Sequence, residues 1–325
     1  MSMRVVPFTP AHSDRWDEIA ERAPMGTFLH TRRFLSYHGE RFRDASVLVT
    51  DDGDTLLAVL PAALDPADPL RVVSHPGSTY GGLVHDGGLY ADGVRAALQA
   101  ICAHFGESGL KVLRYKPVPY LYHLVPSAED VFALSALGAT RVRCDLSCSI
   151  DLAARRAPST RRVRSLKKAH QAGVMTTEDP GRMPDFWRVL ESTLERRYTT
   201  TPVHSLEEIE LLRDRFPDTI RLVSGVLDDE VVAGVVMFAT QRAFHLQYMA
   251  SSQAGMPVGA LDPVVERCIE RANEAGARYF DFGTSMEDRG PALQPGLHRF
   301  KAEFGGGGVV VECYDQPLGA ARADS

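Results

Sequence analysis

The chain has 325 residues, 44% of them hydrophobic and 24% charged, which is enough for about two domains of ordinary size. Its formal net charge of −6 excludes a whole-chain basic field of the kind that binds DNA non-specifically. Residues 1–18 lack the apolar core of a signal peptide, and no apolar run reaches the length of a membrane span. We therefore expect a cytoplasmic protein without a membrane span.

The five cysteines form no paired framework, because their number is odd. Cys144 and Cys148 lie close together, but no second pair and no histidine cluster accompanies them, so we expect no metal site. The pattern favours small buried residues in a reducing compartment.

The first half predicts a mixed series of helices and strands. Two apolar runs flank the turn at 51–54, which indicates a β-hairpin. The helix after the first strand is expected to be capped by Ser13 or Asp14. In chain order, we expect a strand at 4–8, helices at 13–23 and 27–37, the hairpin, a strand at 71–74, a helix at 92–105 and a strand at 111–115.

The second half repeats this order of elements. We expect helices at 161–172, 184–198 and 206–216, a hairpin around 228–230, a strand at 243–250, a helix at 259–275, and strands at 279–282 and 309–314. The periodicity breaks around 150–160, which places a seam there. The sequence therefore predicts two similar α/β domains, residues 1–152 and 153–325.

A glycine-containing loop at 251–260 lies between an expected strand and an expected helix. Backbone N–H groups at such a helix start can bind a pyrophosphate. Gly255 and Gly259 do not complete the acyl-CoA fingerprint, which is Gln or Arg, two residues, Gly, one residue, then Gly or Ala. Two interpretations stay open: a donor-binding loop that includes Ser252 and Ala260, or a tight turn before a packing helix.

Candidate acid–base residues lie on the two strands around that loop. His245 is a potential general base, and Gln247 and Tyr248 share its strand as substrate-binding candidates. Asp281 lies at a strand end, where α/β folds place chemistry, although a carboxylate there can also cap nearby backbone. The polar loop 287–289 follows.

Lys301 lies between Phe300 and Phe304 on a short expected helix. A lysine at this place could offset negative charge on a tetrahedral oxyanion or a phosphate. A solvated helix face is the alternative interpretation.

The helix expected at 161–172 is strongly basic. Arg161, Arg164 and Lys168 fall on one face, and Arg162 and Lys167 flank them. Such a stripe can bind the phosphates of a nucleotide, a CoA or a tRNA, with Arg164 and Lys168 as the central candidates. A solvated face is again the alternative.

Two loops of the first half, 74–84 and 115–123, combine glycine and proline with aromatic and basic residues. This composition fits a substrate-pocket wall, although ordinary loop chemistry also accounts for it. The candidate substrate-binding residues are His75, Tyr80, Lys116, Tyr120 and His123. In the second half, His204 precedes the capping box Ser205–x–x–Glu208, which favours a structural role there.

Several segments together resemble the FemABX-like branch of the GNAT superfamily. They are RSLKKAHQAGV, VVAGVVMF, QYMASSQAG with GALD, YFDFGTS and GLHRFKAEFGG; SHPGSTYGGLV and YKPVPYLYH match the same bacterial group. The resemblance implies an α/β (α+β) fold of two tandem GNAT-type domains, each a mixed, mostly antiparallel sheet flanked by helices. It also implies an active cleft between the domains and a Phe–Lys pair, here Phe300 and Lys301, at the reaction centre.

FemABX proteins transfer an amino acid from aminoacyl-tRNA to an amine on a cell-wall precursor, and related members use acyl-CoA. We therefore expect an N-acyltransferase whose co-substrate is aminoacyl-tRNA or acyl-CoA, with no tightly bound cofactor. The acceptor would be a small-molecule, cell-envelope or natural-product amine. Lys301 would stabilise the developing charge, and Asp281, His245 or a water chain would take the proton. The alternatives are an inactive GNAT scaffold that binds a ligand, and a protein that binds tRNA without chemistry.

Overall fold

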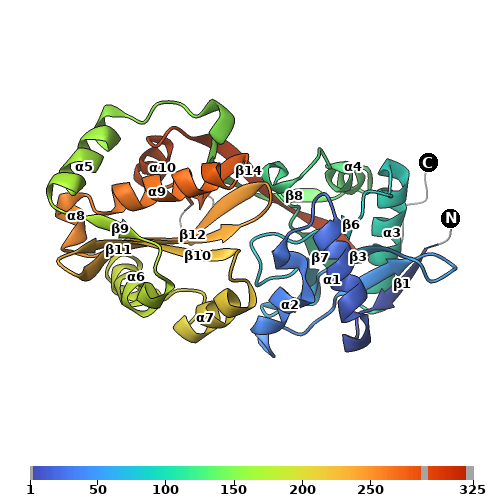
Figure 1. Cartoon of the computed structure of the whole chain (residues 1–325). Helices are drawn as coiled ribbons and strands as arrows, with labels where there is room; N and C mark the ends of the chain where they lie inside the picture. Colours follow the sequence, from blue (N-terminus) through green and yellow to red (C-terminus); the bar gives the residue numbers. More distant parts are fainter. Residues whose placement is uncertain (1–2, 287–291, 320–325) are drawn as a thin grey trace. The chain divides into compact units, whose positions relative to one another are not determined.

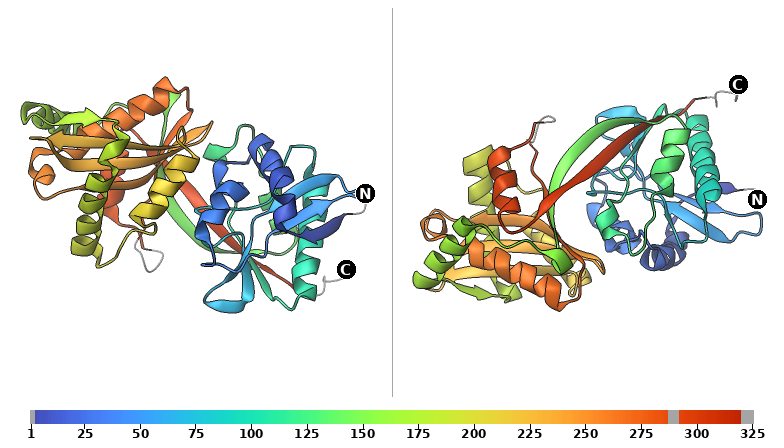
Figure 2. Two further views of the ribbon diagram at one scale, coloured as in Figure 1. Left: turned by 60° about the horizontal axis from the view of Figure 1, so that its bottom comes forward. Right: turned by 90° about the horizontal axis from the view of Figure 1, so that it is seen from above.

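The computed structural model describes residues 3–286 and 292–319 (Figure 1). The chain divides into two compact units, Met1–Cys144 with Val311–Ser325, and Asp145–Val310. The chain enters the second unit along β8 (Thr140–Asp151) and leaves it along β14 (Gly307–Pro317), two long neighbouring strands (Figure 2). The sequence-based boundary was at 152/153, and it assigned the residues after Val310 to the second domain.

The first unit contains two groups of strands. The order in the first group is β1–β2–β3–β6, and its neighbours are all antiparallel. In the second group, β4–β5–β7–β14, the pair β5–β7 is parallel. The strands are β1 (Arg4–Pro7), β2 (Val47–Thr50), β3 (Leu56–Leu60), β4 (Ala63–Asp65), β5 (Asp68–Val73), β6 (Val84–His85) and β7 (Val112–Tyr115).

The helices of the first unit are α1 (Ser13–Arg22), α2 (Arg32–Leu35), α3 (Ala91–Glu107) and α4 (Glu129–Ala136), with 3₁₀ turns η1 (Pro10–His12), η2 (Phe28–His30), η3 (Ser36–His38) and η4 (Tyr120–Tyr122). Helix α3 buries an apolar stripe, from Val94 to Phe105, in the core of the unit. This is the amphipathic packing that its 3.6-residue period predicts.

Two expectations for the first unit were wrong. The helix expected at 27–37 is broken, because Thr31 has extended backbone dihedrals and its side chain accepts a hydrogen bond from the Phe34 N–H as the N-cap of α2. Helix α1 begins at Ser13 itself, so His12 and not Ser13 or Asp14 is its N-cap, without a side-chain cap bond.

The second unit is a mixed sheet between helices, in the order β8–β13–β12–β11–β10–β9. Helix α9 covers one face, and α6 and α7 cover the other (Figure 1). The strands are β9 (Met175–Thr177), β10 (Ile220–Leu227), β11 (Glu230–Ala239), β12 (Ala243–Ser251) and β13 (Tyr279–Thr284). The helices are α5 (Thr160–Gln171), α6 (Met183–Tyr198), α7 (Leu206–Arg215), α8 (Gly255–Val258), α9 (Leu261–Glu274) and α10 (Pro295–Ala302), with 3₁₀ turns η5 (Leu152–Ala154) and η6 (Pro180–Arg182).

Helix α9 confirms its expected apolar face, since Val264, Val265, Cys268, Ile269 and Ala272 are buried in the core of the second unit. Its start differs from the expectation. A residue with positive φ, Gly259 at +73°, ends the short helix α8, so that α9 begins only at Leu261.

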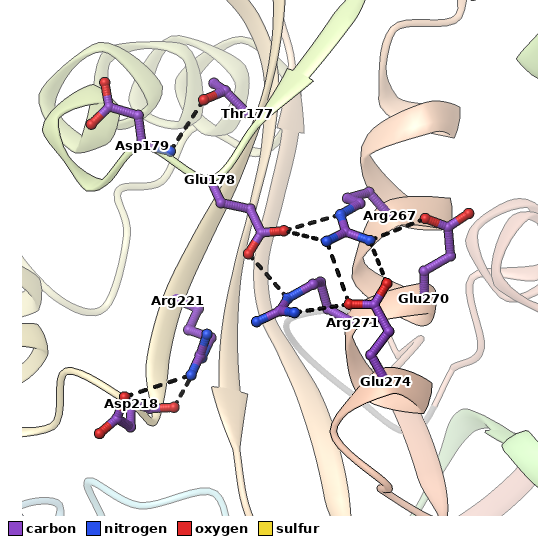
Figure 3. A network of polar contacts seen from close by, with 9 residues as sticks. All are labelled: Thr177, Glu178, Asp179, Asp218, Arg221, Arg267, Glu270, Arg271 and Glu274. Atoms are coloured by element: carbon purple, nitrogen blue, oxygen red, sulfur yellow. Dashed lines mark hydrogen bonds and ion pairs between the residues drawn. The ribbon is translucent and has the colours of Figure 1, made fainter.

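An ion-pair network fastens α9 to the edge of the sheet (Figure 3). Glu178, just after β9, lies 2.9 Å from the Arg267 guanidinium and 3.1 Å from that of Arg271. Glu270 and Glu274 on α9 pair with the same arginines. Because these side chains are partly exposed, each pair contributes at most about 1 kcal/mol, and together they hold the short edge strand β9 in place.

All five cysteines are free thiols. Cys148, Cys268 and Cys313 are buried as expected, whereas Cys144 is exposed. Among the helices of residues 3–286 and 292–319, none combines the length and apolarity that a membrane crossing requires.

Candidate active site

The parallel strands β12 and β13 part within the second unit. Their register runs from Ala243 opposite Tyr279 to His245 opposite Asp281. Beyond that pair β12 continues to Ser251 and β13 to Thr284 without further paired positions between them. His245 and Asp281 are therefore the last paired residues before the two strands separate.

A buried hydroxyl–carboxylate–imidazole chain occupies this place. The Nδ1 atom of His245 lies 2.8 Å from Oδ2 of Asp281, and the Ser147 hydroxyl on β8 donates to Oδ1 at 2.6 Å. The side chain of Asp281 is only 5% exposed and that of His245 is 14% exposed. A buried carboxylate needs such donors. Its bond to Nδ1 selects the tautomer with the proton on Nδ1 and leaves Nε2 as the basic nitrogen.

Asp281 therefore bonds the side chains of Ser147 and His245. Gly283 makes the approach of the imidazole possible. It has φ +71°, and a Cβ atom on it would lie 3.1 Å from Cε1 of His245. A glycine is thus required for both the backbone conformation and the close contact.

Lys301 lies on α10 and points inward, so the solvated-face interpretation is wrong for it. Its side chain is 3% exposed, and Nζ donates to the carbonyl oxygens of Gly283 at 3.0 Å and Thr284 at 2.6 Å. Burial lowers the pKa of Lys301 to about 8, although the nearby Asp281 carboxylate opposes this shift. The residue therefore places a positive charge at the end of β13 at neutral pH.

A β-bulge in β12 brings Tyr248 to the same face as His245. The register between β11 and β12 shifts so that Gln247 lies opposite no residue. Phe238, directly opposite His245, and Tyr248 both contact the His204 ring. The Tyr248 hydroxyl accepts from the His204 N–H at 3.2 Å and lies 2.6 Å from His204 Nδ1. Burial raises the pKa of Tyr248.

The capping box after His204 is confirmed, since Ser205 and Glu208 exchange side-chain and backbone bonds at the start of α7. His204 itself has the structural role that the sequence favours, and it also anchors Tyr248.

The expected donor loop is closed by its own bonds. The Ser252 hydroxyl accepts from the Gly255 N–H at 3.0 Å. Four further N–H groups donate to carbonyls of the same loop: those of Met256, Gly259, Ala260 and Asp262. Backbone N–H groups at a helix start are the kind of donor that binds a pyrophosphate.

Helix α5 packs directly on the same loop. A Cβ atom on Gly259 would clash with the Ser165 hydroxyl, and Asp262 in the first turn of α9 forms a 2.8 Å ion pair with Arg162. The negative Asp262 side chain and the α5 backbone thus take the place at the helix start that favours an anion. Five N–H groups in and next to this loop are thus already bonded within the protein.

Arg162 belongs to the interior rather than to the basic stripe. Its guanidinium lies between the carboxylates of Asp262 and Glu303, and over the ring of Phe300 at 4.7 Å. Phe300 in turn packs edge-on against Phe304. The two residues of the predicted Phe–Lys pair therefore contact different elements. Phe300 packs against Arg162 of α5, whereas Lys301 bonds the end of β13.

The remaining basic residues of α5 are exposed, namely Arg161, Arg164, Lys167 and Lys168. Within residues 3–286 and 292–319, Arg164 and Lys168 form no ion pair. An exposed and unpaired row of this kind keeps the phosphate-binding interpretation open.

In the first unit, the structure brings His75 and Lys116 together. His75 is buried with a positive φ of +64°, and its ring lies 4.7 Å from that of His38. Burial, with help from His38 and Lys116, lowers the pKa of His75 to about 3, so the ring is neutral. Lys116 donates to the Ser78 carbonyl, and burial lowers its pKa to about 8.

The other candidates of the first unit lie apart from this pair. Tyr80 is buried, donates to Thr27 and stacks near Tyr122. His123 is buried and bonds the Val118 carbonyl at 2.9 Å. Tyr120 is exposed. The predicted wall is therefore a pair of packed loops in which His75 and Lys116 interact electrostatically.

The family described as "Acetyltransferase (GNAT) domain" matches residues 153–302. This range covers the parting strands, the donor loop and Lys301. The second unit carries a GNAT acetyltransferase domain. The GNAT resemblance seen in the sequence is thereby confirmed, and the domain supports acyl-group transfer as the general class of activity.

Solved structures confirm the tandem GNAT fold for the whole chain. FemX matches with a TM-score of 0.68 and 14% identity over 98% of both chains. The C-terminal domain of a putative lysylphosphatidylglycerol synthetase from Agrobacterium fabrum matches with a TM-score of 0.60 and 12% identity, over 97% of this chain and 98% of that one. A tandem GNAT protein from the clavulanic acid biosynthesis pathway matches with a TM-score of 0.55 and 13% identity, over 99% of this chain and 100% of that one. At these identities the likeness is one of fold alone, and the comparison with curated proteins finds no match.

Sequence reasoning missed Ser147, because it lies 134 residues before Asp281 on a strand that no motif marks. It also missed the closure of the donor loop by Ser165. The predicted polar loop of Glu287, Asp288 and Arg289 lies outside the described residues.

Proposed function

We propose that this chain is an N-acyltransferase in which His245 is the general base for the attacking amine. The observation that carries the proposal is the chain Ser147–Asp281–His245 at the point where β12 and β13 part. An imidazole held by a buried carboxylate is positioned and has a defined tautomer, as a general base requires.

In this reaction the amine nitrogen attacks the donor carbonyl carbon, and a new C–N bond forms. Nε2 of His245 takes the proton that the nitrogen loses, and the Asp281 carboxylate stabilises the resulting imidazolium. The tetrahedral intermediate collapses with cleavage of the bond to the donor oxygen or sulfur, and the proton passes to that leaving group. The Lys301 charge offsets the negative charge that develops near the end of β13.

The closed loop favours aminoacyl-tRNA over acyl-CoA as the donor. In and next to the loop that would hold a CoA pyrophosphate, five N–H groups are bonded internally, and α5 packs on Gly259. The exposed Arg161, Arg164, Lys167 and Lys168 offer charge to a nucleic-acid backbone instead. The proposed acceptor is a small-molecule, cell-envelope or natural-product amine.

The test is single-turnover transfer from bulk charged tRNA, and separately from acetyl-CoA, to a panel of primary amines. We expect amide product with the tRNA donor that the variant His245→Gln fails to form at the wild-type rate. A matched control is Ser149→Ala, which removes a buried hydroxyl of β8 bonded to the Phe280 carbonyl and leaves the Asp281 contacts in place. Product from neither donor would contradict the proposal and favour a ligand-binding scaffold, for which the closed loop is the supporting observation.

A further inference from the structure

A groove of about 680 Å³ crosses the flank of the first unit. It lies between the end of β1, the segment that leads into β2, the edge strand β4 and the C-terminal turn of α3. Its size falls in the range of small-molecule sites. None of the candidate catalytic residues contributes to it, so the inference is independent of the proposed transfer reaction.

The floor of the groove is apolar. Val47, Phe105 and Leu110 are buried members of the core of the first unit, and Leu64 packs against that core. The wall adds the Phe8 ring. Hydrocarbon that covers such a floor is removed from water, which favours binding.

The groove lining includes a guanidinium held in place by its neighbours, that of Arg32. Arg32 lies over the Phe8 ring with its central carbon 3.7 Å from the ring centroid. It donates to the Ser46 hydroxyl at 3.1 Å and pairs with Asp44. The Asp44 carboxylate also accepts from the Ser46 N–H, and these bonds keep the pKa of Asp44 low. The Arg32 charge is therefore balanced and its side chain held.

A second guanidinium in the groove lining, that of Arg43, is not balanced by a carboxylate. Arg43 lines the groove, is exposed, and forms no ion pair within residues 3–286 and 292–319. His104 lines the groove as well, from the last turn of α3. The groove lining thus contains two guanidiniums and one carboxylate, a positive excess that complements an anion.

We propose that this groove binds a small amphipathic anion, with a single hydrocarbon chain on the apolar floor and a carboxylate or phosphate at Arg43. Apolar core residues and a guanidinium without an ion pair line one hollow, which is the combination that this ligand class requires. The floor excludes a wholly polar anion, and the excess charge disfavours an amine of the same chain length.

Isothermal titration calorimetry on the full chain tests the proposal with octanoate, octyl phosphate, octanol and octylamine as probes. We expect saturable binding of octanoate or octyl phosphate with a dissociation constant of about 1 mM or lower. Octanol and octylamine should bind about tenfold more weakly or worse, because they lack the charge-assisted bond. The stronger of the two anions identifies the head group.

Two variants locate the site. Arg43→Gln should weaken anion binding about tenfold, and Ser108→Trp, at an exposed position on the rim, should abolish it by filling the groove. Arg95→Gln, an exposed arginine of α3 outside the groove, is the matched control and should bind as the wild type does. Absence of saturable binding of both anions would overturn the proposal, as would equal binding of all four probes or unchanged binding by both groove variants.

Discussion

Ser147 and His245 bond the two different oxygens of one buried carboxylate, that of Asp281, from the strands on either side of β13. The three side chains come from β8, β12 and β13, so the sheet itself sets their spacing. Catalytic groups on strands are held more precisely than those on loops.

We expect substitutions of Asp281 and Ser147 to lower the transfer rate by different factors. Asp281→Asn should lower the rate of transfer by about 100-fold or more, because the amide cannot hold the same tautomer of His245 or stabilise its charged form. Ser147→Ala should lower the rate less, by about tenfold, since Asp281 keeps its bond to His245. A proton NMR signal from the His245 Nδ1–H in the hydrogen-bonded region should persist in Ser149→Ala and vanish in Asp281→Asn. Equal transfer rates for all of these proteins would show that the hydrogen bonds of Ser147, Asp281 and His245 do not contribute to the reaction.

Lys301 predicts a particular pH dependence of stability. Burial lowers its pKa from 10.5 to about 8, so between these values the unfolded chain holds a proton that the folded chain has lost. The free energy of unfolding should therefore rise with pH across this window, by about 3 kcal/mol from this group. Urea denaturation of the wild type and Lys301→Met should show the wild type gaining that amount relative to the variant between pH 8 and 10.5. Parallel curves would show that Lys301 keeps an ordinary pKa.

The same titration bears on activity. If the cationic form of Lys301 supports transfer, the single-turnover rate should fall as pH rises above about 8. The variant Lys301→Met should be slow at every pH, and its profile should lack this limb.

Gly283 should not tolerate a side chain. In Gly283→Ala the added Cβ would meet His245 at 3.1 Å on a backbone with φ +71°. We expect a loss of about 1 kcal/mol or more in the free energy of unfolding, and a lower transfer rate because the imidazole moves. Gly276→Ala tests the backbone effect by itself, since Gly276 has φ +75° with nothing near its Cβ position. A Gly283→Ala protein as active as Gly276→Ala would show that the contact with His245 is unimportant.

The basic face of α5 predicts a salt-sensitive interaction with tRNA. Arg164→Gln and Lys168→Gln should each weaken binding, and each should reduce the slope of log affinity against log salt by about one. Arg188→Gln, on the exposed surface of α6, is the control and should leave the slope unchanged. Fluorescence anisotropy with labelled tRNA at several salt concentrations measures the slopes. Slopes that do not differ among these proteins would show that this face does not contact phosphates.

Local sequence patterns predicted many of the helices and strands. Both hairpins and the buried face of α9 follow from periodicity and turn residues, because those signals are contained within each element. The break in the helix expected at 27–37 did not follow from periodicity. Thr31 interrupts that helix by acting as the N-cap of α2 through a single side-chain bond.

The candidate site was predicted in part. His245, Asp281 and Lys301 stood out as ionisable residues near strand ends, and the structure brings them to one place. Ser147 and Ser165 carried no signal, because their roles depend on contacts with residues about 90 to 130 positions away that only tertiary packing creates.

The most direct test of the account is the single-turnover rate of amide formation by wild type and His245→Gln, with charged tRNA as donor and matched thermal stability as the control for folding. The account predicts a loss of about 100-fold or more in the variant, since removal of a general base typically costs this much. A variant that forms product at the wild-type rate would contradict the assignment of His245 as the base.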